Sequence, residues 1–239
     1  MKISKILILS AAALSLASCG EHTHSFGDGA CKSTLDAYLA SNTSNNKKYR
    51  NCLSHVRNIE LEDVERAAEN NIPIAENLIW HTDYDESDPE QRAIKEYILG
   101  CVPEDIYYSG YPMKSLVEAG ISVTSSTDAP AAESILGNIM NIIEVATTGL
   151  APGYNGYHVF NKDELLTVRQ ALDCLTINGA YQLGISDRTG SIKVGKNADF
   201  VVLDRNFLHY AELKDLRTIH NANIESVFFE GKKVYPASN

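Results

Sequence analysis

The chain has 239 residues, and 31 acidic against 21 basic side chains give it a formal charge of −10 at pH 7. Its lysines and arginines form no cluster dense enough to follow a phosphate backbone, which argues against nucleic acid and against a polybasic membrane contact. The acidic charge predicts solubility rather than a particular partner.

The first nineteen residues have the pattern of an export signal. Lys2 and Lys5 precede an apolar run over 6–17, and Leu16-Ala17-Ser18-Cys19 resembles a lipobox. The run is too short to span a membrane as a helix and is excluded from the fold. It predicts cleavage before Cys19, lipid on that residue, and an exported lipoprotein anchored to the membrane. An ordinary cleaved secretory signal is the alternative, and it also directs the chain out of the cytoplasm.

Strands and helices alternate after residue 20. Hydrophobic periodicity predicts strands over 21–25, 53–57, 72–79 and 121–126, helices over 29–40, 62–70 and 111–119, and a loop over 41–48. Two apolar stripes at helical spacing predict two more helices: Ile135, Ile139, Ile142 and Ala146, then Leu165, Val168, Leu172 and Leu175. The βα rhythm predicts an α/β fold with a parallel sheet covered by helices.

The chain after residue 189 changes character. Turns alternate with Val, Ile and Phe runs over 190–204, and 224–235 is typical of a hairpin around Glu230-Gly231-Lys232. We therefore expect three regions: the signal at 1–19, an α/β unit at 20–188, and a β-rich segment at 189–239.

Two further features have more than one interpretation. Cys31, Cys52, Cys101 and Cys174 permit three pairings, but their wide spacing favours mostly buried free thiols with at most one disulfide. The acidic run 83–90 favours a solvated helix entry whose carboxylates complement the helix dipole, and a metal or cationic-substrate loop is the alternative.

Three metal-competent side chains stand at the ends of predicted strands: His24, His55 and Asp128. In βα barrels the loops after the strands assemble the active site, so ligands distant in sequence can converge there. Two imidazoles and a carboxylate suit zinc or a similar divalent ion and leave a position open for water. Such an ion lowers the pKa of bound water toward neutrality.

Longer motifs carry a family resemblance. Residues 24–38, the segment around His55 with 63–66, and 111–130 resemble the regions of the fifth, sixth and eighth strands in the amidohydrolase superfamily, amidohydrolase 3 family. Residues 190–204 and 231–235 resemble its C-terminal signature and closing strand. The order of these motifs makes the resemblance specific, and it covers nearly everything from residue 21 onward.

The resemblance implies a metal-dependent hydrolase acting on carbon–nitrogen bonds of small, non-peptide, amide-type substrates. His24 and His55 become metal ligands, while Asp128 contacts the metal and acts as general base before returning its proton to the leaving nitrogen. The implied fold is the second half of a TIM-like βα barrel, strands five to eight, followed by a β-rich part of a composite β-sandwich.

Other residues receive secondary interpretations. We expect Asp28 to be a helix N-cap. We expect His22 to be packed or behind a ligand, with a His22-Thr23-His24 metal pair as the alternative. His81 and His158 are candidates to line the substrate pocket or are bystanders, and His209 and His220 are expected at the surface.

The chain departs from the family pattern because only the last four strand–helix units have counterparts. Three accounts follow, in order of preference. The first is a truncated or internally deleted amidohydrolase with slight activity; the second is a working half-enzyme that pairs with itself or with a separate N-terminal half. The third is a non-catalytic exported binding lipoprotein built on a barrel fragment.

Overall fold

The computed structural model describes residues 22–41, 50–128, 138–154, 158–210 and 212–236. The expected signal with Cys19 and the loop over 42–48 lie outside these residues. The described elements, in chain order, are β1 (His22–His24), α2 (Asp28–Ala40), β2 (Cys52–Ser54), α4 (Leu61–Glu69), β3 (Ile74–Glu76), η1 (Leu78–Trp80), α5 (Pro89–Leu99), α6 (Glu104–Tyr108), α7 (Met113–Glu118), β4 (Val123–Ser125), α9 (Ile139–Thr148), η2 (Lys162–Glu164), α10 (Val168–Leu175), α11 (Ile177–Gln182), β5 (Phe200–Leu203), α12 (Leu213–Leu216), η3 (Ile219–Asn221), β6 (Ile224–Phe229) and β7 (Lys232–Tyr235).

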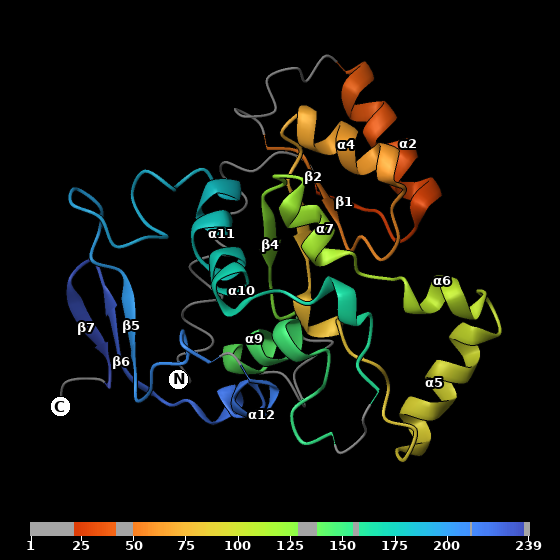
Figure 1. The fold of residues 1–239 in the computed structure, drawn as a ribbon. Helices are drawn as coiled ribbons and strands as arrows, with labels where there is room; N and C mark the ends of the chain where they lie inside the picture. The colour runs from red at the N-terminus through yellow and green to blue at the C-terminus, as the bar shows by residue number, and fades with distance from the viewer. Residues whose placement is uncertain (1–21, 42–49, 129–137, 155–157, 211, 237–239) are drawn as a thin grey trace.

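The first four strands form one parallel sheet in the order β1-β2-β3-β4, so the predicted α/β architecture with a parallel sheet is confirmed (Figure 1). The strands are shorter than expected. The strand predicted over 53–57 ends at Ser54, and the one predicted over 72–79 ends at Glu76. The chain leaves the sheet after Glu76 because it turns into the 3-10 helix η1, where the backbone N–H of Leu78 bonds Ser125 Oγ at 3.1 Å.

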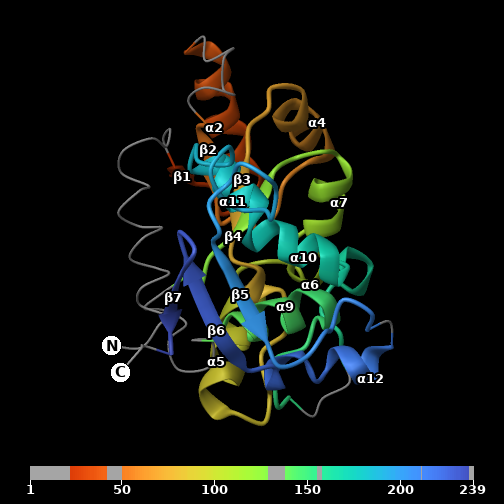
Figure 2. The same cartoon turned by 90° about the vertical axis from the view of Figure 1, so that its left-hand side faces the viewer.

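One face of the parallel sheet forms the core with the helices. Leu53, Ile74 and Val123 are in register across β2, β3 and β4, and each is fully buried. Helices α2, α4 and α7 lie along this side (Figures 1 and 2). The hydroxyl groups of Thr23 on β1 and Tyr38 on α2 are hydrogen-bonded at 2.7 Å, which ties the edge strand to the same layer.

The opposite face carries His24. Its register partner on β2 is Ser54, which pairs in turn with Ala75, and that residue pairs with Thr124 on β4. Gln182 of α11 reaches this face, where it hydrogen-bonds the Thr124 hydroxyl and the Cys52 sulfur. His24 therefore lies on the face away from α2, at the C-terminal end of its strand.

Local sequence signals account for several helix ends. Thr167 and Gln170 form a reciprocal capping box at the start of α10, and this start leaves Leu165 outside the helix, contrary to the predicted stripe. Gly149 ends α9 with a positive φ of 65°, and a Cβ there would lie 2.8 Å from Val159. Only glycine fits this turn without a shift of its neighbours. Gly120, with φ 83°, follows the C-cap of α7 at Ala119, which agrees with the predicted helix end at residue 119.

The acidic run 83–90 combines two roles. Asp88 caps α5 by accepting the backbone N–H groups of Glu90 and Gln91, which confirms a helix entry. Asp83 is not solvated, however, because its carboxylate is buried against Lys95 Nζ at 2.7 Å and accepts the Tyr107 hydroxyl at 3.0 Å. The segment folds back on α5 and α6, which gives this acid a structural ion pair that the sequence pattern did not predict.

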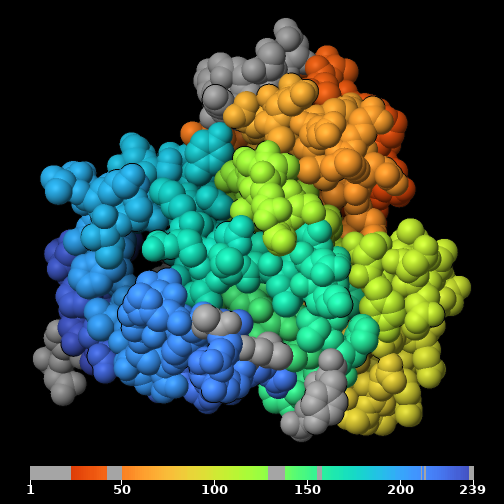
Figure 3. Space-filling view, in the orientation of Figure 1, coloured from red at the N-terminus to blue at the C-terminus, as the bar shows by residue number. Residues whose placement is uncertain are grey.

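The C-terminal strands form a separate antiparallel sheet in the order β5-β6-β7, and the predicted hairpin of β6 and β7 is confirmed. Phe200 and Phe228 stack across β5 and β6 with ring centroids 4.5 Å apart. The space-filling view shows this segment along one side of the molecule, next to the helices of the preceding region (Figure 3).

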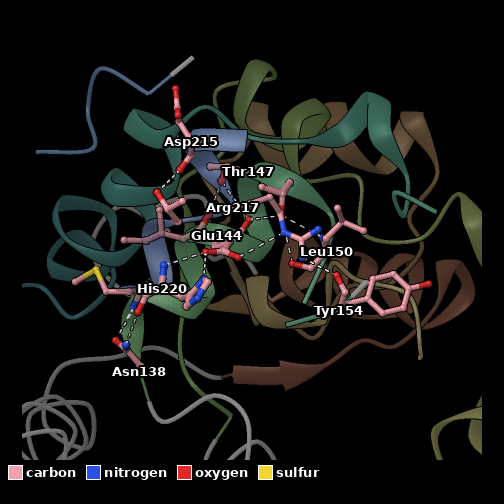
Figure 4. A network of polar contacts seen from close by, with 12 residues as sticks. Asn138, Glu144, Thr147, Leu150, Tyr154, Asp215, Arg217 and His220 are labelled. Atoms are coloured by element: carbon pink, nitrogen blue, oxygen red, sulfur yellow. Dashed lines mark hydrogen bonds and ion pairs between the residues drawn. The ribbon is translucent and has the colours of Figure 1, made fainter. Parts of the chain in front are cut away.

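A buried carboxylate fastens the segment around η3 to helix α9 (Figure 4). Glu144 is fully buried and accepts both the backbone N–H of His220 at 2.9 Å and its Nδ1 at 2.7 Å. Arg217 Nε lies 3.8 Å from the other carboxylate oxygen. We call these three residues the Glu144 clasp. The expectation that His220 is a plain surface residue is wrong, since its ring turns inward to this carboxylate; His209 is exposed as expected.

The four cysteines in the described part of the chain form no disulfide, and three of them are buried while Cys101 is exposed. This agrees with the expectation of mostly buried thiols. No helix in the described ranges has the length and apolar character needed to cross a membrane.

Candidate functional site at the strand ends

The three predicted site residues follow three strands of the parallel sheet, β1, β2 and β4, at the edge where the strands end. His24 is the last residue of β1, His55 follows β2 directly, and Asp128 lies three residues after β4. Because all four strands of the sheet are parallel, their C-terminal ends lie along the same edge, with β3 between β2 and β4. We call His24, His55 and Asp128, with the side chains that hold them, the strand-end site.

The tertiary structure places these side chains near one another. The rings of His24 and His55 are stacked with centroids 4.1 Å apart, and His55 Nε2 lies 3.9 Å from Asp128 Oδ1. The side chains of His55 and Asp128 are 26% and 28% exposed, so both are reachable from solvent. The second Asp128 oxygen accepts a hydrogen bond from Trp80 Nε1 at 3.1 Å.

Two of the three residues have a left-handed backbone. His55 has φ 56° and Asp128 has φ 51°, a region that non-glycine residues seldom occupy. Such strain costs roughly 1–3 kcal/mol and persists only where surrounding contacts enforce it. Strained backbone of this kind clusters at functional sites, and here it occurs at two of the three predicted site residues.

Three contributing residues were missed by the sequence reasoning. Asn77 follows β3, and its Nδ2 lies 3.3 Å from His55 Nδ1 and 3.4 Å from Nε2. Ser126 donates to Asn77 Oδ1 at 2.5 Å, and Trp80 contacts Asp128 as described. Their positions just after β3 and β4 were the available signal, but none of the three is a metal-ligand type.

Burial governs the protonation of this region. Desolvation lowers the pKa of His55 below its usual value, the neighbouring His24 lowers it further, and Asp128 opposes the shift. His55 is thus held toward the neutral imidazole, the form that binds metal. Beneath the site, burial raises the pKa of Glu76 well above its usual range, against the opposing backbone N–H groups of Val56 and Asn77.

The donor set of the site fits a divalent metal in kind, because two imidazoles and a carboxylate are ligands of zinc and similar ions. The positions fit less closely, since the two imidazoles lie face to face instead of converging on a point. Within the described ranges, no group of three His, Cys, Asp or Glu side chains is arranged to hold an ion.

The remaining candidates have other roles. His81 is not a pocket residue, because it is fully buried and its Nε2 lies 3.2 Å from the Phe160 carbonyl. His158 Nδ1 lies 3.1 Å from Asp83, so it belongs to that ion-pair cluster. Asp28 is the first residue of α2 rather than its N-cap, which is Gly27, and no side chain caps this helix end. The side chain of His22 lies outside the described residues.

A family profile decides the membership of this chain. The profile described as Amidohydrolase family matches residues 17–235, most of the sequence. The chain belongs to the amidohydrolase family. This agrees with the resemblance carried by the strand-end motifs.

Curated amidohydrolase relatives cover parts of the chain. It is 32% identical over 130 residues to a 5-methylthioadenosine/S-adenosylhomocysteine deaminase of Thermoanaerobacter pseudethanolicus, covering 52% of this chain and 28% of the relative. An imidazolonepropionase of Bacteroides fragilis is 29% identical, with 63% and 33% covered. An N-substituted formamide deformylase of Arthrobacter pascens is 31% identical, with 46% and 19% covered. The chain thus spans a third or less of the length of these relatives.

Solved structures of amidohydrolase type share the fold. A metal-dependent hydrolase of Pyrococcus horikoshii has a TM-score of 0.61 at 20% identity, covering 87% of this chain and 38% of that one. An adenosine deaminase of Xanthomonas campestris, described with bound zinc, has a TM-score of 0.52 at 18% identity, covering 90% and 45%. At such identities the likeness speaks for the fold alone.

Proposed function

We propose that this chain carries the metal-dependent hydrolytic half of an amidohydrolase and acts on carbon–nitrogen bonds of small, non-peptide, amide-type substrates. The observation that carries the proposal is the juxtaposition of His24, His55 and Asp128 at one sheet edge. Two curated relatives are named as a deaminase and a deformylase, and both of these reactions cleave a carbon–nitrogen bond. This supports the proposed bond type.

In this proposal His24, His55 and Asp128 would hold a divalent ion, with zinc as the first candidate. When bound, such an ion supplies Lewis-acid activation of water and of the substrate carbonyl. The chain's own groups do the rest. Asp128 accepts a proton from the attacking water and later donates it to the leaving nitrogen, while the neutral imidazole of His55 keeps a lone pair available for binding.

The same proposal extends to architecture and location. The parallel sheet is the second half of a TIM-like barrel, and the β5-β6-β7 sheet is part of a composite β-sandwich. Within the described residues β1 and β4 are the two outer strands, so each has an edge for a second copy or an N-terminal half. Residues 1–19 support export and a lipid on Cys19, which would place the protein at a membrane surface.

Substitution of Asp128 tests the enzyme directly. Purified full chain with zinc is expected to hydrolyse an N-acyl or formamide-type substrate, and Asp128→Asn is expected to lower kcat by at least about 100-fold because the general base is lost. Asp163→Asn, an exposed acid in η2, is the matched control and should leave kcat unchanged. Undiminished turnover in Asp128→Asn rejects the assigned base.

Metal analysis separates the enzyme from the non-catalytic alternative. The folded chain should retain about one zinc per molecule after dialysis, and the double variant His24→Ala, His55→Ala should lose it. Metal-independent uptake of a small ligand by that double variant, without hydrolysis by the wild type, would favour a binding protein instead.

A further inference from the structure

The two carboxylate oxygens of Asp128 have different neighbours. Oδ1 lies 3.9 Å from His55 Nε2, whereas Oδ2 accepts a hydrogen bond from Trp80 Nε1 at 3.1 Å. One oxygen therefore faces the predicted metal ligand, and the other is held by an indole.

The chemistry of the indole suits this second contact. The N–H of tryptophan donates a hydrogen bond, accepts none, and does not titrate in the range where proteins are folded. Oδ2 is therefore bonded to a group that can only donate, whereas no hydrogen bond to Oδ1 is formed among the described residues. Trp80 is half-buried on η1, so its large ring is restrained by packing as well as by this bond.

A second set of contacts ties the Asp128 loop to the same stretch of chain. Ser126 donates to Asn77 Oδ1 at 2.5 Å, and the Asp128 backbone N–H lies 3.4 Å from Ser126 Oγ. Ser125 accepts the backbone N–H of Leu78 at 3.1 Å. The segment after β3 thus braces the end of β4 at the two serines that precede the strained Asp128 backbone.

Resting on the proposed function, we propose that Trp80 is a positioning residue for Asp128. Its N–H fixes Oδ2, so Oδ1 is the oxygen that takes part in proton transfer. In the first step an O–H bond of the attacking water breaks and the proton passes to Oδ1. The electron pair left on the water oxygen forms a bond to the substrate carbonyl carbon, and the carbonyl π pair moves to its own oxygen. When the carbonyl re-forms, the carbon–nitrogen bond breaks and its electron pair goes to nitrogen; the same proton passes from Oδ1 to that nitrogen, and Asp128 ends ionised.

Removal of the N–H tests the assignment through kinetics. Trp80→Phe keeps an apolar ring without the donor, and it is expected to lower kcat about 10- to 100-fold with KM nearly unchanged, as is usual for groups that orient a ligand or base. Tyr97→Phe, at an exposed position of α5, is the matched control. An unchanged kcat in Trp80→Phe, in an enzyme that Asp128→Asn inactivates, overturns the positioning role while the proposed function stands.

An isosteric replacement guards against a folding defect. Trp80 is the only tryptophan in the chain, so biosynthetic incorporation of β-(3-benzothienyl)alanine changes this one side chain. The analogue has sulfur in place of the N–H and keeps the shape of the ring. It should reproduce the loss of kcat; full activity in this protein also overturns the proposal.

Fluorescence supplies a readout that needs neither metal nor substrate. Because the single tryptophan bonds Asp128, metal-free Asp128→Ala should shift the emission maximum relative to wild type, and Asp163→Ala should not. Identical emission from wild type and Asp128→Ala contradicts the contact. If the wild type hydrolyses nothing, the proposed function fails, and this measurement still decides whether Trp80 holds Asp128.

Discussion

The strand-end site and the Glu144 clasp both gather acids and histidines, but they use them differently. In the clasp a fully buried carboxylate is bonded by His220 and approached by Arg217. In the strand-end site the imidazoles of His24 and His55 face each other, and Asp128 Oδ1 is 3.9 Å from the nearest imidazole nitrogen.

This difference separates a structural polar cluster from the site that we propose to be functional. One oxygen of the buried Glu144 carboxylate takes both contacts of His220, and the other lies near Arg217 without a hydrogen bond to any described residue, so this acid joins two segments of the chain. In the strand-end site the imidazoles and the carboxylate are partly exposed and do not hydrogen-bond one another. They can therefore still bind a ligand, at a cost in folding stability. Burial and pairing therefore distinguish the two regions better than residue type does.

The largest predicted effect is a loss of folding stability on acidification, caused by the buried His81. Burial lowers the pKa of His81 to about 4, while its unfolded value is near 6.5. The stability that its neutral ring contributes is present above pH 6.5 and is lost as the pH falls toward 4, by about 3 kcal/mol.

Urea unfolding of wild type and His81→Gln across that window measures this term. The wild type should lose stability more steeply than the variant as the pH falls. If the free energy of unfolding falls equally with pH in both proteins, the buried His81 ring does not cause the loss of stability at low pH.

Breaking the clasp is the next largest effect. Glu144→Gln removes the negative charge, which leaves Arg217 without its counterion and His220 without its carboxylate acceptor. Fully buried pairs cost about 3–5 kcal/mol when broken, and the partial exposure of Arg217 lowers the expected loss to about 2–3 kcal/mol.

Chemical denaturation followed by circular dichroism tests this loss, with Glu118→Gln as control. Glu118 lies in an exposed pair with Lys114 at 3.9 Å, so its replacement should change stability by less than about 0.5 kcal/mol. Equal stabilities of the two variants would mean that the clasp is not a fastening element.

The smallest predicted effect has the opposite sign. Neither of the buried Glu76 oxygens forms a hydrogen bond within the described residues, and the nearby N–H groups of Val56 and Asn77 offset only part of the burial, so replacing the carboxyl by an apolar chain should stabilise the fold. Glu76→Met is expected to gain about 1–2 kcal/mol at neutral pH.

The pH dependence provides the check on Glu76. Because burial raises the pKa of this acid above 4.5, its penalty is smallest below that pH and grows as the pH rises. The gain of Glu76→Met in thermal or urea unfolding should grow in the same direction. A gain independent of pH would place its origin in packing rather than in ionisation.

Parts of the fold and site were accessible from sequence because they rest on local patterns. The βα alternation, the C-terminal hairpin and the helix end at Gly120 follow from periodicity and turn chemistry. The strand-end positions of His24, His55 and Asp128 follow from the same reasoning. The roles of Asn77 and Trp80 do not, since neither is a metal-ligand type and their partners are 22 and 48 residues away.

The sequence by itself determined the class of this protein: its alternation of apolar periods produces a parallel sheet, and its ordered motifs identify an amidohydrolase. Tertiary structure alone decided which polar groups remain available. Asp83 and His220 looked solvent-facing and became partners of buried or half-buried charges, whereas Asp128 was left half-exposed beside His55. The physical reason is that desolvation and pairing depend on which segments pack together, and no local pattern encodes those long-range contacts.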